Sequence, residues 1–332
     1  MRAAVVATLL GVAGSAGIAT AGPTFWDFNV YSRTTIGGEK QGYGSSIQGA
    51  IGAAGDAWFS SFAGRTSEKA SPGLPGGFYG GGNLTITSGS IGSGGVYVAG
   101  DASLNGVDIA GDINAGGDLS GEGTVKGAAY LGGSFLSGKV MDISDGVFGG
   151  SGGYKSPIEV KAAAEYFAGL SSYAGSLTTN GKYVNNWGEI VIDTNDALTV
   201  VNMTSSDIAN AWGLRISGKG TVIVNVDGTE VKLGSKTWTY ENGASSNTTL
   251  LNLTDATYLA LSGDNNVNIL AINAETNFSK GVVRGNLIVG SLMGEGSVEW
   301  DGGFTGSASI PSPGMLGMLA TVGVLAVRRQ RR

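Results

Sequence analysis

The 332-residue sequence contains no cysteine and no histidine. The missing cysteines exclude a disulfide framework and a thiolate metal site, and the missing histidines remove the commonest general base and metal ligand near neutral pH. We therefore expect a protein that is not an enzyme and that holds no cofactor. Charged residues are scarce, at 14%, and the net charge is −6. A nucleic-acid partner is not expected, because phosphate binding requires a concentrated basic face.

Glycine is abundant, at 60 residues, and 42% of the chain is hydrophobic. Between Gly94 and Gly138 the glycines recur at intervals of about six residues and separate apolar segments such as VYVAGD, VDIAGD and INAGGD. Each glycine inside a helix costs about 1 kcal/mol relative to alanine, so a helix is excluded. The interval is typical of a parallel β-solenoid with glycine at its corners. The alternative, a flexible linker, lacks the Val, Ile and Leu that recur here.

The N-terminal segment, residues 1–21, has the pattern of a secretory signal peptide. Arg2 precedes an apolar run, and Ala19-Thr20-Ala21 forms an Ala-x-Ala site that predicts cleavage between Ala21 and Gly22. The apolar run is short for a membrane span. A buried N-terminal helix is the alternative.

The C-terminal segment, residues 307–332, has the pattern of a sorting signal. A short apolar run from Met315 to Val327 stands between a proline motif and an arginine cluster, and it is shorter than the about 20 residues that a transmembrane helix needs. We expect transient membrane insertion, with a permanent anchor as the alternative. The segment resembles the PEP-CTERM tail that exosortase-type enzymes of Gram-negative bacteria recognise, although Ser312 replaces the glutamate. The residues concerned are Pro311, Ser312, Pro313, Gly314, Arg328, Arg329, Arg331 and Arg332.

Residues 22–306 are expected to form one mostly β domain with a single long α-helix packed alongside. Ser156, Pro157 and Glu159 predict a capping box, and the helix is expected at about residues 157–175. Its apolar stripe should include Ile158, Ala162, Phe167, Leu170 and Leu177. Short strands on both sides of the helix indicate one right-handed parallel solenoid. The aromatic segment Phe25–Tyr31 is suited to capping an open end of it.

Several blocks together resemble the choice-of-anchor A family. They are SIQGAIGAAGDAWF, VYVAGDASL, VIVNVDG, LLNLTDATYLALSG and ILAINAETNFSKGVVRGNLIVGSLMGEGSVEW, in this order between about Phe25 and Gly306. The resemblance implies a surface-anchored, adhesin-like domain with a β-helix of ice-binding-like outline. It implies no catalytic residues.

Acidic residues follow glycine at recurring positions, namely Asp56, Asp101, Asp112 and Asp118. They form either a catalytic or metal-binding row or, as we favour, corner residues that accept hydrogen bonds from neighbouring backbone. A bound calcium ion stays open as the alternative to having no cofactor. Closely spaced oxygen ligands occur at Asp193, Asn195 and Asp196, and also in the segment 264–266. Thr85-Ile86-Thr87 is a single Thr-x-Thr segment and a weak indication of ice binding.

The sequence thus predicts a secreted structural or adhesin-like protein at the cell surface or in the extracellular matrix of a Gram-negative bacterium, beyond its inner membrane. The expected partners are an exosortase-type processing enzyme and extracellular polysaccharide or cell-surface components. Two alternatives stay open, a polysaccharide-active β-helix enzyme and an ice-binding protein. The first would require acidic and basic side chains that converge on one face.

Overall fold

The computed structural model describes residues 24–136, 141–150, 156, 158–194 and 196–306. The predicted cleavage position at Ala21 and Gly22 and the C-terminal tail lie outside the described residues. Within them the chain is mostly β, with parallel sheets and two α-helices, α1 (Val160–Ser176) and α2 (Ser205–Asn210). The expected mostly β, parallel architecture with one long helix is confirmed.

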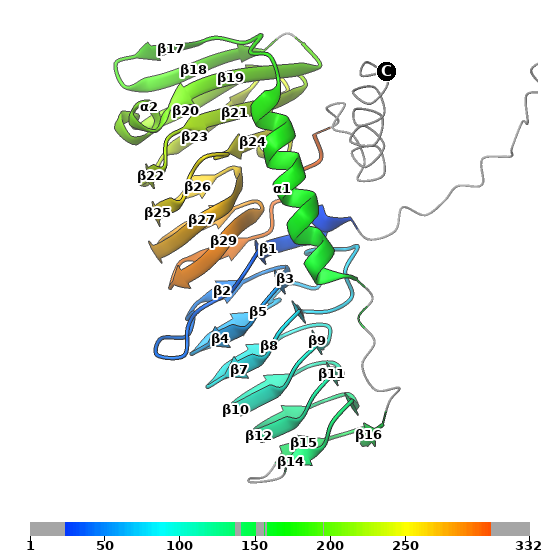
Figure 1. Ribbon diagram of the computed structural model, residues 1–332. Helices are drawn as coiled ribbons and strands as arrows, with labels where there is room; N and C mark the ends of the chain where they lie inside the picture. Colours follow the sequence, from blue (N-terminus) through cyan, green and yellow to red (C-terminus); the bar gives the residue numbers. More distant parts are fainter. Residues whose placement is uncertain (1–23, 137–140, 151–155, 157, 195, 307–332) are drawn as a thin grey trace, which may run out of the picture.

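The larger sheet runs along the whole stack (Figure 1) and, in the described part of the chain, contains 14 strands. Short three-residue strands dominate one half, and longer strands dominate the other. Its path is β16 (Val147–Gly149), β13 (Ala129–Leu131), β11 (Ile113–Ala115), β9 (Val96–Val98), β6 (Phe78–Gly80), β3 (Ala50–Ala53), β1 (Phe28–Ser32), β29 (Leu287–Gly294), β27 (Asn268–Lys280), β24 (Thr249–Asn252), β21 (Thr221–Asp227) and β19 (Leu198–Thr204), with β25 (Tyr258–Ser262) pairing with β27 and with β22 (Glu230–Leu233).

The second sheet also pairs in parallel and contains 12 of the described strands. Neighbours along it are strands that are not consecutive in the chain, and we call the stretch of chain that leads from one strand to its neighbour in the same sheet a coil. Its path is β14 (Phe135–Leu136), β12 (Leu119–Val125), β10 (Ala102–Ile109), β8 (Gly89–Ile91), β5 (Phe62–Gly64), β2 (Ser46–Ile47), β30 (Ser297–Glu299), β28 (Val282–Arg284) and β26 (Asn265–Asn266), with β15 (Met141–Ile143), β7 (Leu84–Ile86) and β4 (Ala57–Phe59) attached at its side.

A third, four-stranded sheet closes one end of the stack. Its strands are β17 (Tyr183–Asn186), β18 (Glu189–Thr194), β20 (Gly213–Gly218) and β23 (Thr237–Glu241). β17 and β18 form an antiparallel hairpin, in contrast to the parallel pairs of the two large sheets. Two short 3-10 helices, η1 (Phe25–Asp27) and η2 (Ser246–Thr248), complete the elements of the described residues.

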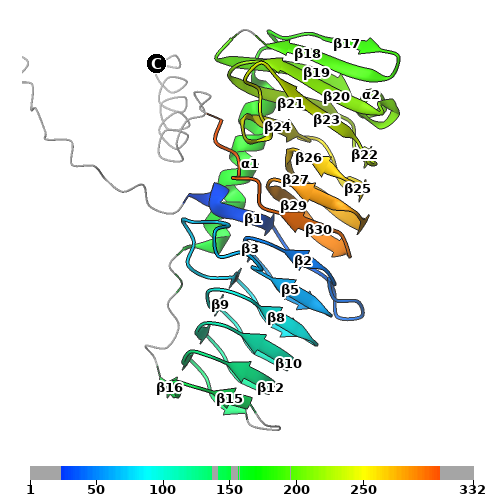
Figure 2. The ribbon, with the colours of Figure 1, turned by 180° about the vertical axis from the view of Figure 1, so that it is seen from behind.

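The first described strand, β1, lies in the middle of the stack. β1 lies between β3 and β29, with Val30 in register with both Ile51 and Leu287. From there the chain winds to β16 at one end, returns along the side of the stack as α1, and winds back from β19 to β29 and β30 (Figures 1 and 2). The expectation that Phe25–Tyr31 caps an open end is wrong. Both edges of β1 carry a partner, because the returning C-terminal coils supply the second one.

Helix α1 covers one side of the larger sheet. Val160, Ala163, Phe167, Leu170 and Ala174 are buried, at the helical spacing expected of an amphipathic segment. The first four belong to a cluster with side chains of β1, β24, β27 and β29, whereas Ala174 packs with Val200 of β19 and Ile223 of β21. The Tyr31 hydroxyl donates to the Val160 carbonyl at 2.8 Å, and burial raises the pKa of this tyrosine.

Two details of the predicted helix are wrong. The N-cap is Glu159, without a side-chain cap, whereas the Ser156 hydroxyl bonds to the carbonyl of Ile158. The capping box therefore does not form, and Pro157 lies outside the described residues. Ala162 is exposed, and its neighbour Ala163 is buried in its place, because alanine fits either position. The other members of the predicted stripe are buried or half-buried, namely Ile158, Phe167, Leu170 and Leu177.

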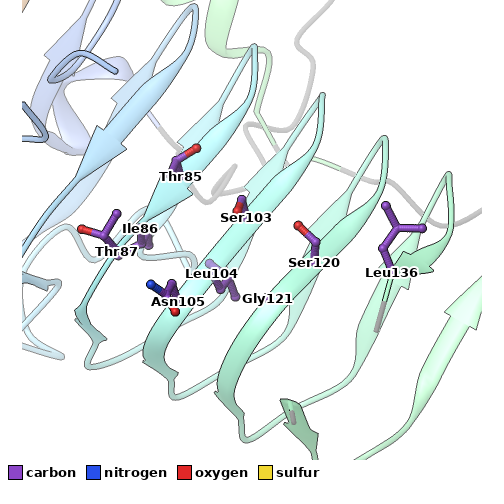
Figure 3. Close-up of a pocket in the computed structure, with 9 residues that line it drawn as sticks. All are labelled: Thr85, Ile86, Thr87, Ser103, Leu104, Asn105, Ser120, Gly121 and Leu136. Carbon is purple, nitrogen blue, oxygen red and sulfur yellow. The ribbon is translucent and has the colours of Figure 1, made fainter. Parts of the chain in front are cut away.

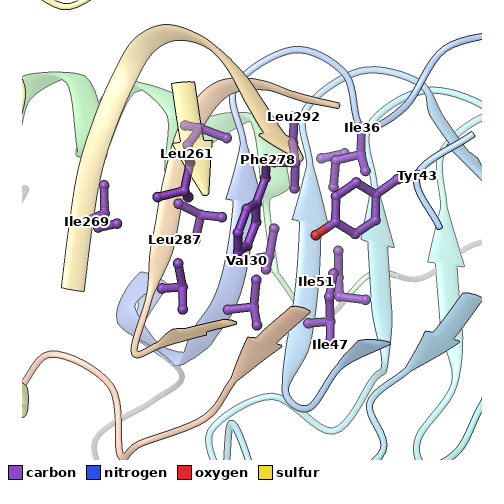
Figure 4. Close-up of a cluster of buried hydrophobic side chains, with 14 of the residues drawn as sticks. Val30, Ile36, Tyr43, Ile47, Ile51, Leu261, Ile269, Phe278, Leu287 and Leu292 are labelled. Atoms are coloured by element: carbon purple, nitrogen blue, oxygen red, sulfur yellow. The ribbon is translucent and has the colours of Figure 1, made fainter. Parts of the chain in front are cut away.

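The main core fills the space between the two large sheets. Where the first and last coils meet, Val30, Ile47 and Ile51 face Leu287 and Phe278, and all five are buried (Figure 4). Buried apolar residues alternate with outward residues along the strands. On β10, for example, Leu104 and Ile109 are buried, whereas Ser103 and Asp108 are exposed. This alternation determines which side chains face solvent on the surfaces described next.

Candidate functional site

One row of small polar side chains crosses the second sheet on its outer side. Thr85 of β7 is in register with Ser103 of β10, Ser103 with Ser120 of β12, and Ser120 with Leu136 of β14. Figure 3 shows these four side chains pointing away from the sheet. We call this surface, lined by Thr85, Ser103, Ser120 and Leu136, the hydroxyl face. Ser103 is exposed, Thr85 and Ser120 are half-buried, and Leu136 is 50% exposed.

The row exists because inward and outward residues alternate on each strand. The neighbouring residues Leu84, Ile86, Ala102, Leu104 and Leu119 are buried in the core. Since side chains at every second position share one face, the residue between two core residues is placed outward on β7 and β10, and Ser120 is placed outward after the core residue Leu119 on β12. The parallel register then aligns these outward residues from coil to coil.

A shallow, open depression of about 390 Å³ lies on the hydroxyl face. Thr87 and Asn105 extend its polar lining, and Leu136 supplies an apolar wall (Figure 3). Gly121 forms part of the lining with φ +112, and a Cβ there would lie 1.6 Å from the Leu104 carbonyl oxygen. Glycine is therefore required at this position, and neighbouring strands approach closely. The open shape suits an extended ligand and would enclose little of a compact one.

The aspartates that follow glycine are corner residues. Asp101 Oδ1 accepts a hydrogen bond from the Asp118 amide at 2.8 Å, and Asp118 Oδ1 accepts one from the Ser134 amide at 2.7 Å. In the same way, Asp56 Oδ1 accepts a hydrogen bond from the Asn83 amide, and Asp112 Oδ1 accepts one from the Ala128 amide. Each side chain thus joins its own coil to the next one. The favoured prediction that corner aspartates bond to neighbouring backbone is confirmed.

Two glycines lie directly beside a corner carboxylate. A Cβ at Gly117, before Asp118, would lie 2.0 Å from Asp101 Oδ1, and one at Gly133, before Ser134, would lie 2.2 Å from Asp118 Oδ1. The carboxylate of one coil therefore occupies the space beside the glycine of the next coil. At Gly55 and Gly111, which precede Asp56 and Asp112, a Cβ would instead lie closest to a backbone carbonyl oxygen.

Two of the predicted calcium ligands, Asp264 and Asn265, have partners elsewhere in the protein. The Asp264 carboxylate lies 3.7 Å from the Arg284 guanidinium, and the Asn265 amide donates to the Gly234 carbonyl. Asn195 lies outside the described residues, so the segment around Asp193 and Asp196 is described only in part. Among the described residues, no group of three or more acidic side chains has the arrangement of a metal site.

Among the described residues, acidic and basic side chains converge around two arginines. Arg284 of β28 contacts Glu299 of β30, its partner in register, at 3.0 Å and also lies 3.7 Å from Asp264. Arg215 of β20 lies within 3.7 Å of both Glu189 of β18 and Glu241 of β23, which are each two residues out of register with it. These ion pairs are partly exposed. Exposed pairs of this kind contribute about 0–1 kcal/mol each to stability.

The predicted sorting motif, Pro311 to Gly314 with the arginines from Arg328 to Arg332, lies outside the described residues. In the part of the chain that the structure describes, no helix has the length and apolar character needed to cross a membrane.

Comparison with known protein families gives one match over most of the chain. The model of the family described as a putative ice-binding-like adhesive domain matches residues 24–300. The chain belongs to this family. The match to an adhesive domain supports the adhesin-like part of the prediction, whereas the choice-of-anchor A and PEP-CTERM resemblances stay predictions. Searches among curated proteins and among solved structures found no match.

Sequence reasoning missed most of the hydroxyl face of this adhesive domain. It singled out Thr85 and Thr87 but neither Ser103 nor Ser120, because the row becomes visible only when the strands are aligned. The signal was present as a polar residue between two apolar residues in Leu84–Ile86, Ala102–Leu104 and Leu119–Gly121, with glycine as the last member of the third segment.

Proposed function

We propose that the protein is a secreted, surface-anchored adhesive domain whose hydroxyl face binds extracellular polysaccharide. In this proposal the stacked parallel strands form a right-handed β-solenoid, which presents the face as a rigid surface. The observation that carries the proposal is the alignment of Thr85, Ser103 and Ser120 on three neighbouring strands beside an open depression. The family match supports the adhesive role.

The chemistry of the face suits an extended sugar polymer. Hydroxyl groups both donate and accept hydrogen bonds, as sugar hydroxyls do, and Leu136 offers an apolar surface for the C–H groups of a sugar ring. Strands lie about 4.8 Å apart, so the row offers regularly spaced contacts along one line. A ligand that follows this line would contact several coils at once.

The proposal extends to processing and location. The signal-peptide pattern of residues 1–21 supports secretion, and the motif from Pro311 with its arginine cluster supports transient membrane insertion and handling by an exosortase-type enzyme. We place the mature protein at the cell surface or in the extracellular matrix of a Gram-negative bacterium. We further propose that it is not an enzyme and that it holds no resident cofactor.

The test measures binding of the purified protein to an array of bacterial and plant polysaccharides, with calcium and with a chelator. We expect retention of at least one polysaccharide, with equal binding in the two conditions. Ser103→Arg should lower this binding at least tenfold, because a long charged side chain covers the row. The matched control is Ser279→Arg, since Ser279 is also an exposed strand serine but does not line the depression. Failure of the unaltered protein to bind any polysaccharide would overturn the proposal.

Ice binding is a second candidate, which the aligned hydroxyl row and the description of the family favour. The row contains Thr85, Ser103 and Ser120, but Leu136 follows as the next residue in register. Thermal hysteresis of the purified protein tests this candidate. Ice binding would be established in place of polysaccharide binding if the protein shows thermal hysteresis, if Ser103→Arg abolishes it, and if no polysaccharide is bound.

A further inference from the structure

Large apolar side chains that are exposed gather at the two ends of the stack in the described part of the chain. Leu136, Val147 and Phe148 belong to the coil of β14–β16, and Val184, Trp187 and Trp212 lie around the β17–β18 hairpin at the opposite end (Figure 1). Trp187 is 95% exposed and Trp212 is 55% exposed. Tryptophans this exposed contribute little to a core, so the hairpin end requires another explanation.

Trp187 occupies a strained position in the hairpin turn. Asn186 pairs with Glu189, so Trp187 and Gly188 form a two-residue turn, with φ of +54 and +87. Positive φ at both positions is typical of a type I′ turn, in which asparagine or glycine is preferred at the first position. A bulky residue there is a genuine outlier, and the exposed indole makes no packing contact that offsets the strain. Strain of this kind is found at functional sites.

Trp212 braces the same turn from the beginning of β20. Its backbone amide donates to the Gly188 carbonyl at 2.9 Å, and its indole Nε1 donates to the Trp187 carbonyl at 3.1 Å. The Asn185 side chain accepts a hydrogen bond from the Gly188 amide at 2.8 Å. The turn is therefore held by three hydrogen bonds, and Trp187 projects from a fixed backbone.

Two cations near the turn and Trp212 already have partners. Arg215 lies between Glu189 and Glu241, and the Lys236 ammonium donates to the carbonyls of Ala209 and Ala211. Asn186, beside Trp187, is exposed and carries a neutral amide. The surface around the two indoles thus combines aromatic area with uncharged hydrogen-bonding groups.

We infer that Trp187, braced by Trp212, is a stacking platform for a pyranose ring of a neutral polysaccharide. The C–H face of the ring would lie on the Trp187 indole, and the amide of Asn186 would bond to hydroxyls at the ring edge. A neutral sugar is favoured over an anionic one because Arg215 of β20 and Lys236, which immediately precedes β23, already have partners. The inference rests on the proposed function and adds a second contact, distant from the hydroxyl face (Figure 1).

The test uses Trp187→Asn, a substitution that the turn geometry favours. Since asparagine is preferred at the first position of a type I′ turn, the melting temperature should stay equal or rise. Affinity for neutral hexose oligomers, measured by calorimetry with cellohexaose, maltohexaose and mannohexaose, should fall at least tenfold. Val184→Thr is the matched control, because it removes another exposed apolar side chain from the same hairpin and should leave the affinity unchanged.

The outcomes separate this inference from the proposed function. Unchanged oligomer binding by Trp187→Asn, with Ser103→Arg still impaired, would overturn the platform and leave the hydroxyl face in place. An equal loss in Val184→Thr would also overturn it, since the contact would then be unspecific apolar adhesion. Absence of binding by the unaltered protein to these oligomers and to every polysaccharide on the array would overturn both proposals. If the protein binds lipid vesicles through Trp187 and binds no sugar, the inferred sugar platform is overturned and Trp187 contacts a membrane surface instead.

Discussion

Asp and Asn side chains connect successive coils both in a ladder at an exposed corner and in a ladder beneath α1. At the corner, Asp101 accepts a hydrogen bond from the backbone of the next coil, and its neighbours Asn83 and Asp118 do the same. Beneath α1, Asn252 donates to Asn225 at 2.8 Å and accepts from the Ser171 hydroxyl at 2.7 Å. Asn252 is completely buried, whereas the corner residues are half-buried or exposed.

The difference in exposure explains why carboxylates occur in one ladder and amides alone in the other, although both ladders join coils by hydrogen bonds. At the corner, water stabilises the charge, so Asp and Asn alternate without penalty. Under the helix, an unpaired carboxylate would lose its hydration, and only amides are present in that ladder. The corner aspartates therefore require no catalytic or metal-binding role, and the following predictions test how far the two ladders differ.

The largest effect is expected from Asn252→Ala. This substitution leaves the buried groups of Ser171 and Asn225 without their partner, and each such group costs about 1–3 kcal/mol. We expect the free energy of unfolding in urea to fall by about 3 kcal/mol. Asn202→Ala, at the exposed end of the same ladder, is the control and should cost about 0.5 kcal/mol. Equal effects of the two substitutions would mean that burial does not distinguish the ladders.

A smaller effect is expected from Gly117→Ala at the corner. The new Cβ would lie 2.0 Å from Asp101 Oδ1, so the carboxylate must move and lose its bond to the Asp118 amide. We expect a loss of about 2 kcal/mol in the free energy of unfolding. In the Asp101→Ala background the same change should cost at least about 1 kcal/mol less, because the clash is removed. Additive costs in this double-mutant cycle would contradict the proposed contact.

Asp101→Ala and Asp101→Asn separate hydrogen bonding from charge. Alanine removes the acceptor for the Asp118 amide and should cost about 1 kcal/mol. Asparagine keeps an acceptor oxygen, as Asn83 does one coil earlier, and should cost less than about 0.5 kcal/mol. Thermal unfolding of both variants measures the difference. A loss as large for asparagine as for alanine would show that the charge itself is required.

Asp207 provides an exposed example outside both ladders, and we expect its effect to be the smallest. Hydrogen bonds from the Thr204 hydroxyl and backbone amide hold the pKa of this carboxyl below its usual range. A lowered folded-state pKa stabilises the protein above the unfolded pKa, and this stabilisation is lost as pH falls through the folded value. The difference in melting temperature between the protein and Asp207→Asn should therefore be constant above pH about 5 and shrink below pH about 4. A difference that grows on acidification would contradict this assignment.

The sequence predicted the local features of the fold because they depend on neighbouring residues. Glycine spacing indicated the corners, Gly-Asp pairs indicated the corner hydrogen bonds, and the segment after Ser156 indicated the helix. The position of β1 depends on strands about 20 and about 260 residues away, with Val30 in register with Ile51 and with Leu287. No local pattern encodes such pairing, and β1 was therefore placed at an end.

The hydroxyl face could not be predicted from the sequence for a related reason. Successive residues of the corner ladder are 18, 17 and 16 residues apart, so the coils differ in length. Thr85, Ser103 and Ser120 therefore do not stand at a fixed interval in the sequence. Trp187 was missed because its exposure depends on the turn geometry, and a tryptophan between strand segments would ordinarily be assigned to the core.

The most direct test of the central claim compares the polysaccharide binding of Asp101→Asn and Ser103→Arg side by side. The two residues are neighbours in sequence, but Asp101 belongs to the corner ladder and Ser103 to the hydroxyl face. We predict that Asp101→Asn binds as tightly as the unaltered protein and that Ser103→Arg binds at least tenfold more weakly. Loss of binding in Asp101→Asn with full binding in Ser103→Arg would contradict the claim that the corners are scaffold and the hydroxyl face is the adhesive surface.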